Sequence, residues 1–252
     1  MTLVESIFLG ALEGMTEFLP VSSTGHLILL SSLLGLEQTE AHKSYEIAIQ
    51  LGSILAVLFY YTKRVFSSKD LWLKIGVAFI PTGLSGLFLY STIKSLFTPN
   101  TVVYMLIIGG IIMIVLEMLR KEDKGVHLEE VSYKQAVLIG IAQSFAMVPG
   151  TSRSAATIIG GLLSGLNRRA AVEFSFILAV PTMMIATAYD LYKNAEHFVV
   201  DDWGLLGVGF VSAFVFALLA IRFFLAFVSR YSFIPFGVYR IFIGLIFLYF
   251  IL

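Results

Sequence analysis

Six long apolar runs divide this 252-residue chain. Each approaches the roughly 20 apolar residues that a helix needs to cross the hydrocarbon core of a bilayer. The runs are continuous, so they predict spanning helices and not the short alternating strands of a barrel. They cover residues 45–62, 75–93, 101–119, 171–190, 203–221 and 232–252.

Two further hydrophobic regions, 2–36 and 135–166, are each broken in the middle by a polar segment. Each half has about 16 residues or fewer, so its helix would be roughly 24 Å long against a core of about 30 Å. Pro20 and Pro149 would end the first helix of each pair. We expect two re-entrant helix–loop–helix hairpins; the alternative is two further pairs of ordinary spanning helices.

The two polar segments resemble each other. The first reads EGMTEFLPVSSTGH at 13–26, and the second reads AQSFAMVPGTSRS at 142–154, with Pro20 aligned to Pro149. The likeness continues beyond them, because EIAIQLG at 46–52 parallels EFSFILA at 173–179, and YMLIIG at 104–109 parallels YRIFIG at 239–244. The sequence therefore predicts one membrane domain made of two repeats, 1–120 and 135–252, joined by a charged linker at 121–134.

Each repeat would hold one hairpin and three spans. Because three is odd, the second copy enters the membrane upside down, which is an inverted-topology repeat with broken helices meeting near the midplane. The expected fold is thus an all-α polytopic membrane protein with six transmembrane helices and two re-entrant hairpins.

The composition agrees with this class of protein. The chain is 58% hydrophobic and 13% charged, whereas a soluble domain carries about 25% charged residues. The formal net charge is zero, so nothing in it favours nucleic acid as a partner. With no cysteine, disulfides and cysteine-based metal sites are excluded. The first residues lack the basic start of a cleavable signal.

Lysine and arginine set the expected orientation, because they collect on the cytoplasmic side. Twelve of them fall in segments 63–74, 120–134, 168–169 and 222–230, against three on the other side. Both termini would then face outward. The three on the outer side are Lys43, Lys94 and Lys193; the twelve are Lys63, Arg64, Lys69, Lys74, Arg120, Lys121, Lys124, Lys134, Arg168, Arg169, Arg222 and Arg230.

The first polar segment carries acidic and hydroxyl groups. Glu13 and Glu17 are four residues apart and share one helix face, where two carboxylates suit an oxygen-seeking cation such as Mg²⁺ or Ca²⁺; the alternative is that they solvate a helix end. Ser22, Ser23, Thr24 and Gly25 follow, as substrate-binding or helix-capping groups. His26 beside them is a candidate nucleophile or acid–base group.

The second segment has the composition of an anion site. Gly150 lets backbone N–H groups turn towards an anion at a helix N-terminus, and Thr151, Ser152 and Ser154 add hydroxyls. Arg153 offers a planar fork that fits phosphate; a salt bridge to Glu13 or Glu17 is the structural alternative. Arg240 in the last span is as well explained by pairing with Glu46 or Glu173 as by catalysis.

At these residues the chain resembles the bacterial undecaprenyl-diphosphate phosphatases, the bacitracin-resistance family. The resemblance rests on 13–26, on PGTSRS at 149–154 and on QLGSILA at 50–56, and it extends over essentially the whole chain. It implies hydrolysis of a C55 polyprenyl diphosphate to the monophosphate and phosphate, which recycles the lipid carrier of cell-wall synthesis.

The resemblance also implies residue roles. The acidic pair falls on Glu13 and Glu17, the serine and histidine on Ser23 and His26, and the arginine on Arg153, with a divalent cation and a site open to the outer face. Attack by Ser23, by His26 or by water stays open, and so does the oligomeric state, with a homodimer among the options. The competing class is a transporter or lipid flippase, because such proteins also place broken helices at the midplane.

Overall fold

The computed structural model describes residues 1–36, 39–62, 68–89, 95–96, 98–120, 125–193 and 202–251. Within these ranges the chain is helical and forms no strand, apart from one isolated bridge between Val126 and Leu166. The helices, in chain order, are α1 Leu3–Thr16, α2 Ser23–Leu33, α3 Glu40–Tyr60, α5 Lys69–Phe88, α7 Pro99–Leu119, α8 Tyr133–Ser144, α9 Arg153–Leu163, α10 Arg168–Lys193, α11 Trp203–Val228 and α12 Ile234–Ile251, with single 3₁₀ turns η1 Leu128–Glu130 and η2 Phe145–Met147.

The six predicted spans correspond to α3, α5, α7, α10, α11 and α12. Among the described helices, four are long and apolar enough to cross a membrane: α5, α7, α10 as far as Tyr189, and α11. The apolar part of α12, Ile234–Tyr249, is shorter than these four helices. Helix α3 is not among the helices that are long and apolar enough. Residues 90–93 of the second predicted span, 121–124 of the linker, and Lys63, Arg64 and Lys94 lie outside the described residues.

Each interrupted region forms two short helices that pack against each other, α1 on α2 and α8 on α9. Both first helices begin with a capping box, Thr2 with Glu5 in α1 and Ser132 with Gln135 in α8, which satisfies backbone N–H groups at the helix start. The chain then turns before the second helix. We call the two turns tip 1 (residues 17–22) and tip 2 (residues 145–152).

Both tips end on a serine with a positive φ, 73° at Ser22 and 72° at Ser152. Each of these serines immediately precedes its second helix. The N-cap residues of the two capping boxes are 130 positions apart in the sequence, and so are these two serines. The two prolines, in contrast, are 129 positions apart. In the register of 130, Glu13 corresponds to Gln143 on α8.

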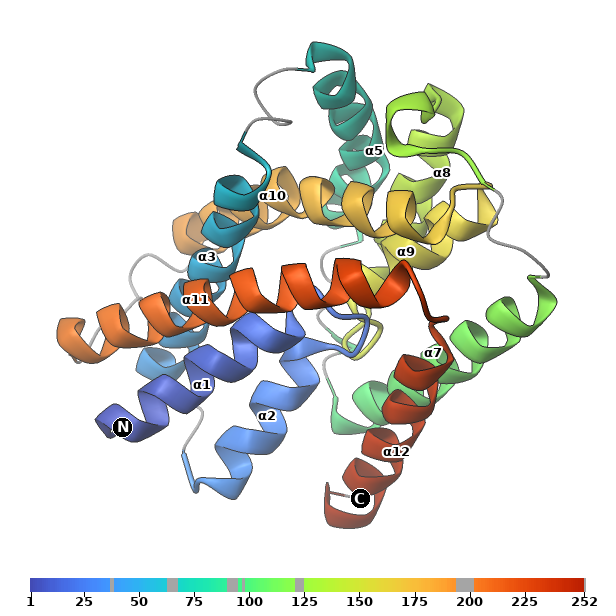
Figure 1. The fold of residues 1–252 in the computed structure, drawn as a ribbon. Coiled ribbons are helices and arrows are strands. Elements are labelled where there is room, and N and C mark those ends of the chain that lie inside the picture. The colour runs from blue at the N-terminus through green and yellow to red at the C-terminus, as the bar shows by residue number, and fades with distance from the viewer. Residues whose placement is uncertain are drawn as a thin grey trace.

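The two halves of the chain exchange their packing partners. Helix α1 lies along α11, and the corresponding α8 lies along α5, while α7 packs on α12 (Figure 1). Glycines allow the first two contacts, because a Cβ on Gly14 would approach the carbonyl oxygen of Ala213, and one on Gly140 that of Ala78, within 3.0 Å. Close backbone approach through small residues is how helices associate in lipid.

This crossed packing brings tips 1 and 2 together near the middle of the molecule (Figure 1). The Ser154 hydroxyl, at the start of α9, donates a 2.7 Å hydrogen bond to the carbonyl of Leu19 in tip 1. An aromatic cluster supports the junction, with the ring of Phe18 edge-on to Phe176 of α10 at 5.3 Å.

Candidate functional site

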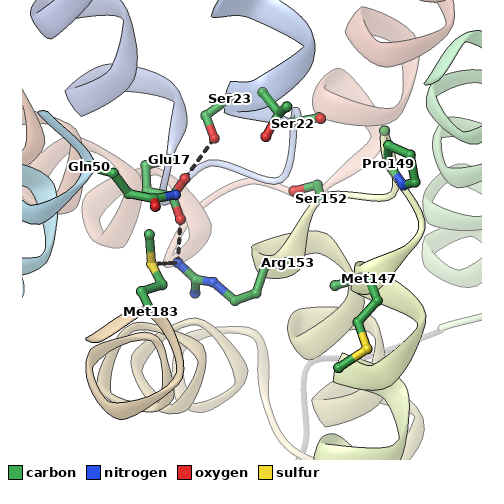
Figure 2. A pocket seen from close by; sticks show the side chains of 12 residues that line it. Glu17, Ser22, Ser23, Gln50, Met147, Pro149, Ser152, Arg153 and Met183 are labelled. Atoms are coloured by element: carbon green, nitrogen blue, oxygen red, sulfur yellow. Dashed lines mark hydrogen bonds and ion pairs between the residues drawn. The ribbon is translucent and has the colours of Figure 1, made fainter. Parts of the chain in front are cut away.

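A cavity of about 160 Å³ opens where the two tips meet. Its walls come from tip 1 and the start of α2, from tip 2 and the start of α9, and from single residues of α3 and α10 (Figure 2). At about 30 Å³ per water molecule, it has room for a small polar group and not for a long prenyl chain. The lining residues are Glu17, Ser22, Ser23, Thr24, Gln50, Ala146, Met147, Pro149, Gly150, Ser152, Arg153 and Met183.

The carboxylate of Glu17 joins the two halves of the cavity. Its Oε1 atom accepts a hydrogen bond and ion pair from Nη2 of Arg153 at 2.8 Å, and its Oε2 atom accepts a 2.6 Å hydrogen bond from Ser23 (Figure 2). Glu17 is 7% exposed, so solvent screens this pair weakly. Of the two carboxylates expected as partners of Arg153, Glu17 is therefore the one that pairs with it.

Arg153 makes further contacts with α10. Its Nη1 donates to the carbonyl of Ser175 at 3.1 Å, and Nη2 also lies 3.4 Å from the sulfur of Met183. The guanidinium sits over the ring of Phe18, a cation–π arrangement. The buried Nε has no hydrogen-bond partner among the described residues, so one donor of the fork is unused.

Both second helices direct their N-termini at the cavity. Helix α2 begins at Ser23 and α9 at Arg153, and the cavity lining includes the serine before each. The hydroxyl of Ser152 caps α9 by accepting from the backbone N–H of Ala155. The partial positive charge of a helix N-terminus attracts anions, so an anion in this cavity would meet two such termini and an arginine.

His26 does not line the cavity. Its Nδ1 lies 2.8 Å from the carbonyl of Ser22, which can only accept, so Nδ1 carries the proton in the neutral ring. Nε2 then accepts from the hydroxyl of Tyr239 at 2.7 Å, and the two rings stack. Both ring nitrogens are thus engaged away from Ser23 and Glu17.

Glu13 lies one turn before Glu17, is 1% exposed and also does not line the cavity. Its buried Oε1 has no hydrogen-bond partner among the described residues. Leaving a carboxylate oxygen unpaired in such a place is costly. Within the described part of the chain, no three acidic, histidine or cysteine side chains group as metal ligands.

The other predicted site residues fall into two groups. Ser22, Ser23, Thr24, Gly150 and Ser152 line the cavity. Gly25, Thr151 and Ser154 do not: the Ser154 hydroxyl ties α9 to tip 1, and the buried Thr151 hydroxyl has no partner in the described structure.

Two explanations were left open for Arg240, and the first of them, pairing with Glu46 or Glu173, is wrong. Glu46 lies against His42, and Glu173 accepts from Arg169 on its own helix. Arg240 instead donates to backbone carbonyls, including one from each tip. Sequence spacing could not show this, because a carbonyl acceptor is present at every residue and leaves no mark in the sequence.

The cavity is also lined by Gln50, Met147 and Met183, which were not predicted as site residues. Gln50 carried a usable signal, since it is an amide within an otherwise apolar run. The two methionines carried none, because apolar side chains are expected throughout spanning helices.

Comparison with known proteins shows similarity over almost the whole chain. Residues 6–246 match the family model described as bacitracin resistance protein BacA. The undecaprenyl-diphosphatase of Persephonella marina is 58% identical over 254 residues, covering all of both chains. That of Wolinella succinogenes is 57% identical over 253 residues, covering 100% of this chain and 99% of the relative, and that of Campylobacter hominis is 57% identical over 258 residues, covering all of both chains.

Proposed function

The chain belongs to the bacitracin resistance protein family, and from this membership we propose that it hydrolyses undecaprenyl diphosphate to undecaprenyl phosphate and inorganic phosphate. This reaction recycles the lipid carrier of cell-wall synthesis and confers bacitracin resistance. The observation that carries the proposal is the Glu17 carboxylate held between Ser23 of one hairpin and Arg153 of the other. This arrangement brings three groups together in one small cavity: a carboxylate that can act as a base, a hydroxyl group, and a guanidinium group that can bind phosphate.

The diphosphate is the part of the substrate that the cavity fits. Two helix N-termini and Arg153 supply positive potential for its charge. The prenyl chain stays outside, along helix surfaces that expose large apolar side chains, such as Phe88 and Leu87 on α5 and Tyr104 on α7. Contact between the prenyl chain and these side chains costs no free energy in a lipid environment, because both surfaces are apolar.

Arg153 is our candidate for the residue that holds the transferred phosphoryl group. Phosphoryl transfer needs charge neutralisation and in-line positioning more than covalent chemistry from the protein. Arg153 lines the cavity, and the ion pair with Glu17 holds its guanidinium there. A bound phosphate would then share the fork with Glu17.

Ser23 is our candidate nucleophile, with Glu17 as its base. The 2.6 Å hydrogen bond from Ser23 to Glu17 is the geometry that general-base activation requires. Ser23 Oγ bonds to the terminal phosphorus, its proton passes to Glu17, and the bond from that phosphorus to the bridging oxygen breaks, releasing undecaprenyl phosphate. Water then attacks the phosphorus of the phosphoserine, the bond from phosphorus to Ser23 Oγ breaks, and inorganic phosphate leaves. Glu17 returns its proton to Ser23 Oγ, which regenerates the serine and the carboxylate.

His26 is better suited to holding tip 1 than to attacking phosphorus. Its Nε2 lone pair is engaged by Tyr239 and its Nδ1 proton by Ser22. The role that family resemblance implies for His26 is therefore reassigned in this proposal to positioning. Attack by water activated by Glu17 is the route that the experiment below must distinguish from attack by Ser23.

We propose that Glu13 and Glu17 hold a divalent cation, Mg²⁺ or Ca²⁺. The unpaired buried oxygen of Glu13 supports this, because a cation would satisfy it. Two carboxylates are enough where substrate phosphate and water complete the coordination. The cation would supply neutralisation of charge on the diphosphate.

The membrane arrangement is part of the same proposal: six spans, two re-entrant hairpins and an inverted repeat in the bacterial plasma membrane, with the site open to the outer face. Support comes from the matching order of helices in the two halves and from their crossed packing partners. The excess of lysine and arginine on one side sets the orientation. A transporter at the same site would have no use for the bond between Ser23 and Glu17.

The test is phosphate release from a C15 or C55 prenyl diphosphate by purified protein, before and after EDTA. We expect release that stops with EDTA and returns with Mg²⁺ or Ca²⁺. Rapid acid quenching with substrate labelled in the terminal phosphate should leave label on Ser23, none in Ser23→Ala, and normal label in Ser229→Ala as a control. Release without any protein-bound label would assign the attack to water, and no release by folded protein would refute the phosphatase.

A further inference from the structure

The most buried cation of the described chain is Arg240 of α12, which has no exposed surface. Burying a guanidinium is costly unless its donors are satisfied. No carboxylate pairs with it within the described residues, and its charge is met by backbone carbonyls alone. The packing of α12 alone does not explain why a charged side chain is buried at this position.

The four acceptors come from three separate segments of the chain. Nη1 donates to Pro20 of tip 1 at 3.2 Å, and Nη2 donates to Gly150 of tip 2 at 3.1 Å. On α7, Nη2 donates to Met105 at 2.9 Å and Nε to Leu106 at 3.3 Å. One rigid planar group therefore ties both tips to each other and to one long helix.

The fork geometry matters for this contact. The two tip carbonyls are held by different terminal nitrogens of one guanidinium, whose separation is fixed by covalent structure. A lysine would bring a single nitrogen on a flexible stem, and its donors would all radiate from one point. Only an arginine at this position fixes the distance between the carbonyls of Pro20 and Gly150.

Gly109 of α7 makes room for the fork. A Cβ at this position would approach Nη2 of Arg240 within 3.0 Å. Nη2 is the nitrogen that holds Gly150 and Met105. An alanine at 109 would thus displace the fork while leaving the charge and every catalytic side chain in the protein.

We propose that Arg240 is a positioning residue that sets the register of the two tips, so that Ser23 from one hairpin and Arg153 from the other meet at Glu17. It acts through the backbone of the tips and touches no substrate. The effect on turnover rests on the function proposed above, whereas the effect on tip geometry does not.

The kinetic test compares Gly109→Ala with Gly76→Ala, a helical glycine with open space around it. Misplacing catalytic groups by about 1 Å costs on the order of 100-fold in rate, so we expect kcat of Gly109→Ala to fall about 10- to 100-fold. KM should change less than kcat, because the prenyl chain binds outside the cavity and its share of the binding does not depend on the tips. Arg240→Lys should show the same loss in spite of its conserved charge. Wild-type kcat in Gly109→Ala would overturn the proposal.

The geometric test needs no activity. The chain has no cysteine, so spin labels at Ile28→Cys on α2 and Phe145→Cys in tip 2, both exposed, report the distance between the hairpins. We expect one narrow distribution in the wild-type background and in Gly76→Ala, and a broadened or shifted one in Gly109→Ala and Arg240→Lys. An unchanged distribution would overturn the proposal, even with a loss of kcat. If the wild type hydrolyses no prenyl diphosphate, this distance alone decides.

Discussion

At the scale of single residues, the site depends on one buried carboxylate that serves two partners. Glu17 holds Arg153 with one oxygen and Ser23 with the other. Removing one member of a buried ion pair leaves the other charge without compensation, which costs about 3–5 kcal/mol. Substitution of Glu17 therefore disturbs folding as well as chemistry, and substitutions that keep charge are more informative.

Ser152 is a strained residue whose strain can be relieved. Its φ of 72° with ψ of 117° is a conformation that favours glycine, and such strain costs about 1–3 kcal/mol. We expect Ser152→Gly to unfold at a higher temperature than Ser152→Ala in the same detergent, because alanine keeps the strain and both variants lose the hydroxyl. Thermal unfolding of the purified variants checks this. Equal unfolding temperatures would show that the backbone at 152 is not strained.

The sequence predicted those contacts of the site that join two charged side chains, and missed those that involve backbone groups or distant neutral side chains. The acid–arginine pair was among the expected alternatives because Glu17 and Arg153 stand out in apolar surroundings. The contact of Arg240 with the carbonyl of Pro20 and the engagement of His26 by Tyr239 could not be predicted, since both depend on three-dimensional proximity across more than 200 residues. The left-handed serines were also missed, because serine is an unusual choice at a positive φ.

At the scale of elements, the hairpins depend on close helix contacts. Helix α1 approaches α11 through Gly14, and α8 approaches α5 through Gly140. The sequence predicted short paired helices well, because prolines and polar segments interrupt the apolar runs near their centres. It did not predict which long helix each hairpin packs against, since apolar surfaces are interchangeable partners in a sequence pattern.

Gly14→Ala and Gly140→Ala should each destabilise the protein by about 1–3 kcal/mol, because the added methyl group meets a carbonyl that cannot move independently. The matched control is Gly207→Ala on α11, which has open space around it. Unfolding temperatures of the three variants provide the measurement. If all three variants unfold alike, these backbone contacts are looser than the structure indicates.

At the scale of the whole molecule, the two halves share one order of helices and exchange their hairpin partners. The site lies where the halves meet, so neither repeat contains it alone. The repeat was visible in the sequence because polar motifs recur at similar positions. Its register was off by one residue at the helices, because the prolines are offset by 129 residues while the helix starts before and after them are offset by 130.

The proposed orientation puts the N-terminus outside and the linker inside. Single cysteines at Thr2 and Glu129, both exposed, can be placed without background because the chain has none. We expect a membrane-impermeant maleimide to label Thr2→Cys on intact cells and Glu129→Cys only after the cells are opened. The reverse pattern would invert the orientation and place the site's opening on the cytoplasmic side.

The most direct test of the central claim is kcat/KM for prenyl diphosphate in Arg153→Lys beside Arg222→Lys, an exposed arginine on α11. Both changes keep charge, but only the first removes a planar fork from the cavity. The account predicts a loss of about 10²–10³-fold for Arg153→Lys, the scale for removing a charge-stabilising donor, and near wild-type values for Arg222→Lys. Equal activity in the two variants would show that phosphate is not held where the two tips meet.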